Sequence, residues 1–178
     1  NPEIAKFFWA AGVNVLEGYG LSESAPITHV NRPPSTTDVY PSNKIGTIGP
    51  TIGWDKWGSE IPYEPVEEKI ADDGELLIKG ANVMLGYYKR PQETEETLTN
   101  IDGEIWLHTG DLATIDEDGY AKIIGRAKHI LVLRTGKKVA PNHVEPIYKE
   151  HKDIEQIMLL GEGEKFIAAL IVPNYENK

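Results

Sequence analysis

Short apolar runs separated by glycine-containing turns constrain the fold of this chain more than any other feature of its sequence. Two of these turns, Asp72-Asp73-Gly74 and Asp116-Glu117-Asp118-Gly119, lie between runs rich in β-prone residues, which is typical of β-hairpins. The longest apolar run, Phe166 to Val172, has seven residues, whereas a membrane-spanning helix needs about 20. We therefore expect a strand-rich, antiparallel fold and no transmembrane segment.

Helices are expected where a proline opens a segment. Pro2 does so with Asn1 as its N-cap, because proline is favoured in the first helical turn. A short acidic helix is expected from Pro91, and another from near Pro141, which Pro146 would shorten or restart because proline lacks an N–H donor. The expected strands are residues 13–16, 66–71, 75–79, 105–107, 112–115, 120–124, 130–133, 154–160 and 166–172.

Charge and cysteine content exclude several functional classes. The 178 residues carry 18 Lys and Arg against 28 Asp and Glu, a formal net charge of −10, which argues against a nucleic-acid partner and against docking on anionic lipid. The chain has no cysteine, so it has no disulfide framework, thiolate metal site or cysteine nucleophile. The lack of disulfides fits a reducing compartment. We expect a cytoplasmic location, or a membrane-peripheral one within a longer protein.

A glycine-rich turn, Glu17-Gly18-Tyr19-Gly20-Leu21-Ser22-Glu23, follows the first expected strand. Glycine lets a backbone turn tightly and approach a ligand closely. The tyrosine ring offers a flat face to a base, the serine hydroxyl can donate to a phosphate oxygen, and the glutamate can hold Mg²⁺ beside phosphates. Taken alone, however, such a segment is more often an ordinary surface loop.

A second polar segment, His108-Thr109-Gly110-Asp111, comes after another expected strand. An aspartate at a strand edge can accept hydrogen bonds from both hydroxyls of a ribose. His108 and Asp111 suggest a metal site instead, but no third ligand lies nearby in the sequence. Further on, Arg126 and Lys128 follow a turn and a strand, and on their own they indicate a hairpin with solvated cations.

The order and spacing of these segments resemble the adenylate-forming superfamily of acyl-CoA synthetases, luciferases and peptide-synthetase adenylation domains. Residues 17–23 match the family signature E-G-Y-G-L-[ST]-E, and residues 106–111 match W-[FL]-x-T-G-D. The other matching segments are Gly74 to Gly80 with Met84 to Tyr88, Gly125-Arg126-Ala127-Lys128, and Gly136 to Pro141. The resemblance covers essentially the whole chain, and its details look most like long-chain fatty acid CoA ligases.

This resemblance implies a nucleotide site with ATP as substrate and Mg²⁺ as cofactor. Tyr19 would stack on adenine, and Gly20 would line the pocket beside it. Ser22 would contact a phosphate, and Glu23 would hold Mg²⁺.

The resemblance assigns further roles in the later part of the chain. Asp111 would bond the ribose hydroxyls, Arg126 would reach the ribose from the other side, and Ile123 would pack against the nucleotide. Lys128 would lie at the hinge about which a small C-terminal domain swings between two half-reactions. Gly136 would line the channel for the pantetheine arm of coenzyme A.

The expected fold is α+β, an acyl-CoA synthetase fold in truncated form. Residues 1–125 would form a distorted antiparallel β-barrel subdomain at the end of the large AMP-binding domain, and residues 126–178 an incomplete α+β lid domain. The family's phosphate loop would precede Asn1 and its C-terminal catalytic lysine would follow Lys178. We therefore expect no catalytic residue in the chain itself, which would be inactive on its own.

The expected function is part of an ATP-dependent ligase that activates fatty acids as acyl-adenylates and transfers them to coenzyme A. The alternatives are an adenylation domain of another branch, such as a peptide synthetase or an acyl-carrier ligase, and a non-catalytic binding module of the same fold. Residues 50–65 depart from the family pattern, and their aromatic residues, Trp54, Trp57 and Tyr63, would pack on a barrel wall or form an exposed contact patch.

Overall fold

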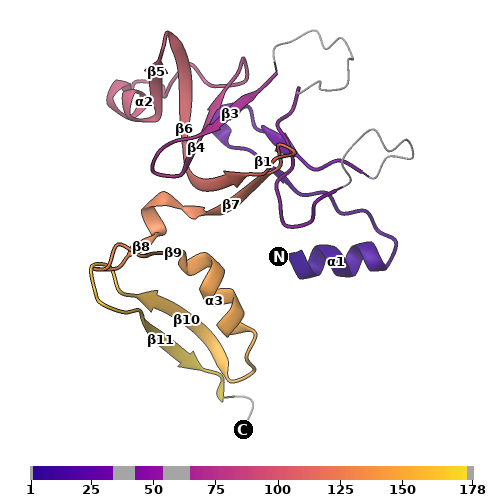
Figure 1. Cartoon of the computed structure of the whole chain (residues 1–178), viewed down its shortest axis with the longest axis vertical. Coiled ribbons are helices and arrows are strands. Elements are labelled where there is room, and N and C mark those ends of the chain that lie inside the picture. Colours follow the sequence, from indigo (N-terminus) through magenta and orange to yellow (C-terminus); the bar gives the residue numbers. More distant parts are fainter. Residues whose placement is uncertain (1, 34–42, 54–64, 176–178) are drawn as a thin grey trace. The chain divides into compact units, whose positions relative to one another are not determined.

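The computed structural model describes residues 2–33, 43–53 and 65–175. The N-cap expected at Asn1 and the aromatic residues Trp54, Trp57 and Tyr63 lie outside these ranges. The chain divides into two compact units (Figure 1). Unit 1 comprises Asn1–Thr109 and Ala113–Ile123, and unit 2 comprises Gly110–Leu112 and Ile124–Lys178.

The N-terminal part of unit 1 confirms the helix that begins at Pro2 but not the strand that should follow it. Helix α1 spans Pro2–Ala10. The expected strand at 13–16 is wrong, because α1 engages backbone groups of this segment: Trp9 Nε1 donates to the Val15 carbonyl at 2.8 Å and the Val13 N–H donates to the Phe8 carbonyl at 2.9 Å. The first ladder forms later, between β1 (Gly18–Tyr19) and β2 (His29–Val30), which are antiparallel.

A five-stranded sheet forms the rest of unit 1 and continues into unit 2. Its strand order is β3-β4-β6-β5, and β7 pairs with β6. The strands are β3 (Glu67–Ile70), β4 (Glu75–Lys79), β5 (Leu98–Ile101), β6 (Glu104–Ile115) and β7 (Ala121–Arg126). The helix expected from Pro91 is α2 (Pro91–Thr97). The sheet is a curled antiparallel half-barrel, which confirms the fold class that was predicted from the sequence.

Two expectations about this sheet are wrong. The strands expected at 105–107 and 112–115 are one continuous strand, β6, so the His-Thr-Gly-Asp segment lies within a strand and not after one. Strand β5 was not expected at all. Its signal is Asp102-Gly103, where both residues adopt positive φ, 55° and 89°, in the turn that joins β5 to β6, and Asp-Gly is a strong hairpin dipeptide.

The core of unit 1 is formed by side chains of β4 and β6 and of the residue that precedes β3. Val66, Leu76, Ile78 and Ala113 are buried together, and each fully buried aliphatic side chain contributes about 1.5–3 kcal/mol. The partly buried residues that pack against this core are Tyr19, Leu21, Ile52, Val83 and Ile123. The core therefore supports the glycine-rich turn directly.

A lysine ties the turn between β6 and β7 to a distant segment. Lys44 Nζ lies 2.6 Å from Asp116 Oδ2 and 2.6 Å from Asp118 Oδ2, and 4.6 Å from the centre of the Tyr120 ring. Burial lowers the pKa of Lys44, but the hydrogen bonds to both aspartates outweigh it and the pKa is raised. Burial likewise raises the pKa of Asp116, and hydrogen bonds from Lys44 and the Tyr120 and Asp118 backbone lower it overall.

Unit 2 is a small α+β assembly. After a 3₁₀ turn at Ala127–His129, the chain forms β8 (Leu131–Val132), β9 (Lys138–Val139), α3 (Pro141–Lys149), β10 (Ile154–Leu160) and β11 (Ala168–Pro173). β10 and β11 form an antiparallel hairpin beside α3 (Figure 1). Helix α3 is short, as expected, but it runs through Pro146 without restarting. The expected α+β class is confirmed.

Within the described residues, no helix is long and apolar enough to span a bilayer.

Candidate functional site

The glycine-rich turn is shaped by backbone contacts that only glycine allows at one position. A Cβ on Gly20 would lie 1.6 Å from the Pro26 carbonyl oxygen, so any other residue would force the two backbone segments apart. Tyr19 immediately precedes it, paired with His29 across β1 and β2. After Leu21 the chain forms a 3₁₀ turn, η1 (Ser22–Ser24). Ser22 is exposed on this turn, and its hydroxyl is therefore accessible.

Residues 80–87, which also belong to unit 1, hold this turn in place by hydrogen bonds. Asn82 Nδ2 donates to the Ser24 carbonyl at 2.9 Å, and the Met84 N–H donates to the Glu23 carbonyl at 2.8 Å. The Tyr87 hydroxyl donates to Glu23 Oε1 at 2.6 Å. That hydrogen bond and partial burial raise the pKa of Tyr87 above its ordinary 10.0, so the phenol remains a donor at neutral pH. Glu23 is thus held by its backbone and by its side chain.

The residues around Glu23 fit a Mg²⁺ ion that is shared with phosphates. Mg²⁺ usually binds one or two carboxylates together with substrate phosphates, not an all-protein cage. Among the described residues, no group of three or more His, Cys, Asp or Glu could hold a metal ion. Glu23, which is held by its backbone and by Tyr87, is a carboxylate of the kind that Mg²⁺ can take as one of its few protein ligands.

A buried network that the sequence reasoning missed lies behind Tyr19. The His29 side chain is 0% exposed, and its ring meets the Tyr19 ring edge-on at 5.8 Å between centroids. His29 Nε2 lies 2.8 Å from Glu68 Oε2, and Nδ1 lies 2.8 Å from Thr28 Oγ1. Because an ionised carboxylate only accepts, Nε2 carries the proton in this pair. No local pattern in the sequence could have indicated a contact across 39 positions.

Asp111 and Arg126 are brought together within unit 2. Arg126 Nε lies 2.9 Å from Asp111 Oδ1; the aspartate side chain is 6% exposed and the arginine side chain 53%. Gly110 adopts a φ of +71°, and a Cβ there would lie 3.4 Å from Arg126 Nη1. A carboxylate paired with a guanidinium combines hydrogen-bond acceptors and donors, which is the chemistry that recognises hydroxyl groups.

The strand that carries Asp111 is anchored just before it. His108 Nδ1 lies 2.7 Å from Glu75 Oε2, and Thr109 Oγ1 donates to the Leu76 carbonyl at 2.7 Å. The histidine that suggested a metal site is thus paired with a carboxylate of the neighbouring strand. These contacts explain the local position of the His-Thr-Gly-Asp segment in structural terms.

The expected site residues fall into both units. Unit 1 holds Tyr19, Gly20, Ser22, Glu23 and Ile123, and unit 2 holds Asp111, Arg126, Lys128 and Gly136. Ile123 packs against the unit 1 core near Tyr19 and Leu21, which pack there too. Lys128 is exposed in the 3₁₀ turn Ala127–His129, and Gly136 adopts a φ of +81° in the turn between β8 and β9.

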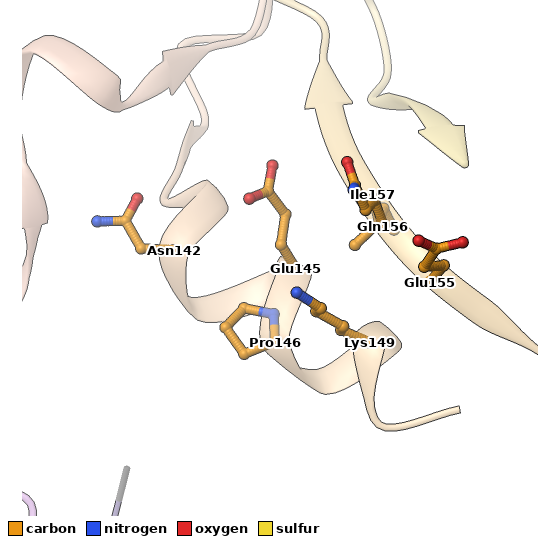
Figure 2. A pocket seen from close by; sticks show the side chains of 7 residues that line it. All are labelled: Asn142, Glu145, Pro146, Lys149, Glu155, Gln156 and Ile157. Carbon is orange, nitrogen blue, oxygen red and sulfur yellow. The ribbon is translucent and has the colours of Figure 1, made fainter. Parts of the chain in front are cut away.

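A separate cavity lies in unit 2 between α3 and β10 (Figure 2). It has a volume of about 610 Å³ and contains none of the expected site residues. Glu145 reaches across from α3, and its Oε1 accepts a hydrogen bond from the Leu159 N–H at 2.8 Å. The lining residues are Asn142, Glu145, Pro146, Lys149, Glu155, Gln156 and Ile157.

Two family models match the chain, one in its N-terminal half and one near its C-terminus. Residues 1–88 match the AMP-binding enzyme family, and residues 128–178 match the C-terminal domain of AMP-binding enzymes. These two segments contain Tyr19 to Glu23 and Lys128 to Gly136 respectively.

Curated relatives and solved structures agree with these family models. The long-chain-fatty-acid–CoA ligase FadD15 of Mycobacterium bovis is 38% identical over 96% of this chain and 25% of its own length. A long-chain-fatty-acid–CoA ligase of Salmonella typhimurium is 38% identical over 84% of this chain and 25% of its own length. The chain thus spans about a quarter of the length of these relatives.

The fold is shared with O-succinylbenzoate coenzyme A synthetase (MenE) from Bacillus subtilis, whose structure was solved in complex with AMP. The TM-score is 0.73 at 22% sequence identity, over 98% of this chain and 34% of the other. With the two family models and the glycine-rich turn, these likenesses lead to one assignment. The chain belongs to the AMP-binding, or adenylate-forming, enzyme superfamily.

Proposed function

We propose that this chain is part of an ATP-dependent acid–thiol ligase that activates long-chain fatty acids and transfers them to coenzyme A. The observation that carries the proposal is the 38% identity to long-chain-fatty-acid–CoA ligases over up to 96% of this chain. The reaction has two steps: a carboxylate attacks the α-phosphorus of ATP and releases pyrophosphate, and a thiol then displaces AMP from the acyl-adenylate. A cytoplasmic location is part of this proposal.

In unit 1, the glycine-rich turn would bind the adenine and phosphate end of the nucleotide. Tyr19, backed by the buried His29, would present its ring to adenine, and the absent Cβ of Gly20 keeps the adjoining backbone compact. The exposed Ser22 hydroxyl would donate to a phosphate oxygen. Glu23 would hold Mg²⁺, which when bound neutralises charge on the phosphates. Ile123 would add an apolar contact.

In unit 2, Asp111 and Arg126 would bind the ribose. The Asp111 carboxylate can accept from both ribose hydroxyls while Arg126 fixes its orientation at 2.9 Å. Lys128 would act as the hinge between the two half-reactions; it lies four positions after Ile124, where the last segment of unit 2 begins. Gly136 would leave room for the pantetheine arm, since no heavy atom of the described residues lies within 4 Å of the Cβ position there.

The test is substrate-dependent exchange of ATP and pyrophosphate by the full-length protein in which this sequence occurs. We expect exchange that depends on fatty acids of long chain length and on Mg²⁺, and formation of acyl-CoA when coenzyme A is added. Exchange driven by amino acids would instead indicate a peptide-synthetase branch. Protein that binds AMP but exchanges with no carboxylate would indicate a non-catalytic module.

Variants connect the assay to the site. Tyr19→Ala and Asp111→Ala should each reduce the affinity for AMP by about fivefold or more, since each removes a direct contact worth about 1–3 kcal/mol. Asp118→Ala is the matched control, because this exposed aspartate lies in the turn between β6 and β7 and pairs with Lys44. Equal affinities of all three variants would contradict the proposed nucleotide site.

A further inference from the structure

The Glu23 carboxylate has a side-chain partner for which no role has been assigned. The Tyr87 hydroxyl donates to Glu23 Oε1 at 2.6 Å, a short distance for a hydrogen bond to a charged acceptor. The two residues are 64 positions apart in sequence, and both belong to unit 1. In the described part of the chain, no side chain bonds the other carboxylate oxygen, Oε2.

Tyr87 is itself held in place by the start of α2. Its N–H donates to Thr94 Oγ1 at 2.9 Å, and its carbonyl accepts from the Arg90 N–H at 3.1 Å. The residue before it, Gly86, adopts a φ of +145°, and a Cβ there would lie 2.7 Å from Thr94 Cγ2. A glycine is therefore needed for the chain to pass Thr94 and deliver the tyrosine to Glu23. Tyr87 as a whole residue is 36% exposed, against 87% for Tyr88.

We propose that Tyr87 is a positioning residue: its hydroxyl holds Oε1 of Glu23, and Oε2 would be left to bind Mg²⁺ when Mg·ATP binds. This inference rests on the proposed function. A glutamate on a surface turn otherwise samples several rotamers, and ordering it costs free energy when a ligand binds. Because the Tyr87 hydrogen bond already orders the Glu23 side chain before nucleotide binds, binding would lose less conformational entropy. The hydrogen bond also leaves Oε2 without a side-chain hydrogen bond from the described residues, and Mg²⁺ usually takes only one or two carboxylates from a protein.

The expected effect of losing the hydroxyl is selective. In Tyr87→Phe the ring remains, and the hydroxyl that donates to Glu23 and also hydrogen-bonds the Thr97 side chain is removed. Binding of Mg·ATP should weaken by about tenfold, since a hydrogen bond to a charged group is of that order. Binding of AMP without metal should be unchanged, because AMP makes no use of Glu23 in this scheme.

The neighbouring tyrosine provides a matched control. Tyr88 is 87% exposed and its ring lies 5.2 Å from Lys89 Nζ, so Tyr88→Phe makes the same chemical change without touching Glu23. Glu23→Gln serves as the reference for complete loss of the carboxylate ligand.

The experiment measures the affinity of the full-length protein for Mg·ATP and for AMP by calorimetry, and for Mn²⁺ in the presence of ATP by electron paramagnetic resonance. The proposal expects Tyr87→Phe to follow Glu23→Gln in both metal-dependent measurements, and Tyr88→Phe to match the wild type. It is overturned if Tyr87→Phe matches Tyr88→Phe, or if AMP binding falls as much as Mg·ATP binding, which would indicate a structural role alone.

The design separates this inference from the proposed function. If Glu23→Gln leaves the metal-dependent affinities unchanged, the assignment of Glu23 to Mg²⁺ is wrong and the inference about Tyr87 falls with it. If Glu23→Gln weakens them and Tyr87→Phe does not, the proposed function stands and only the role of Tyr87 is refuted.

Discussion

Removing the carboxylate of Glu68 should destabilise the fold although Glu68 lies on the sheet and not in the core. Its Oε2 is the partner of His29 Nε2 at 2.8 Å, and the two side chains are 13% and 0% exposed. Glu68→Ala would leave a buried N–H without an acceptor, which costs about 1–3 kcal/mol. Partial entry of water at the 13% exposed end reduces the upper figure, so we expect a loss of about 2 kcal/mol. Glu68→Gln keeps an acceptor oxygen and should cost less than about 1 kcal/mol.

The neighbouring glutamate, Glu67, provides a control for Glu68→Ala. Glu67 pairs with Lys79 at 2.8 Å, but its side chain is 55% exposed, and such surface pairs contribute about 0–1 kcal/mol. Urea unfolding at pH 7, followed by tryptophan fluorescence and extrapolated linearly, gives each free energy of unfolding. If Glu68→Ala costs no more than Glu67→Ala, the buried network does not support Tyr19 as described.

Three further predictions concern the turn, the Lys44 cluster and the hinge. Gly20→Ala places a Cβ 1.6 Å from the Pro26 carbonyl oxygen, so thermal unfolding should show a loss above the roughly 1–3 kcal/mol typical of overpacking. Lys44→Met should cost about 0–1 kcal/mol near neutral pH. The difference in unfolding free energy between this variant and the wild type should shrink below about pH 4, because Asp116, whose pKa is lowered by Lys44, begins to take up a proton there. It should also shrink above about pH 10.5, because Lys44, whose pKa is raised by its partners, begins to lose its proton. A constant difference from pH 3 to 11 in urea titrations would refute this. Lys128→Pro, compared with Lys128→Ala in single-turnover assays of each half-reaction, should slow thioester formation by more than about tenfold and adenylation less, since proline restricts φ at the hinge; equal slowing of both steps would contradict the hinge role.

The parts of the fold that were predictable depend on backbone chemistry within a few residues. The turn at Asp72-Asp73-Gly74 was predictable because Gly74 adopts a φ of +95° and Asp73 Oδ1 accepts from the Glu75 N–H at 3.0 Å. Helices beginning at Pro2 and Pro91 were predictable because proline suits the first helical turn.

The errors arose where a local pattern competed with distant contacts. Residues 13–16 are mostly apolar and β-prone, yet the Val15 carbonyl accepts a hydrogen bond from the Trp9 side chain and the Val13 N–H donates to a carbonyl of α1. The strand β6 reads as two short runs because polar residues interrupt it at 108–111, but Glu75 and the Leu76 carbonyl satisfy two of those residues, and the ladder continues.

For the candidate site, the sequence by itself determined which residue types stand in the glycine-rich turn and where that turn lies. The glycine at position 20, the hydroxyl at 22 and the carboxylate at 23 all belong to one short segment. Only the tertiary structure decided what supports these residues. The pairs Glu23–Tyr87 and His29–Glu68 join positions 64 and 39 apart, and a polar side chain takes as its partner whichever group the packed strands bring within hydrogen-bond distance, which no local sequence pattern specifies.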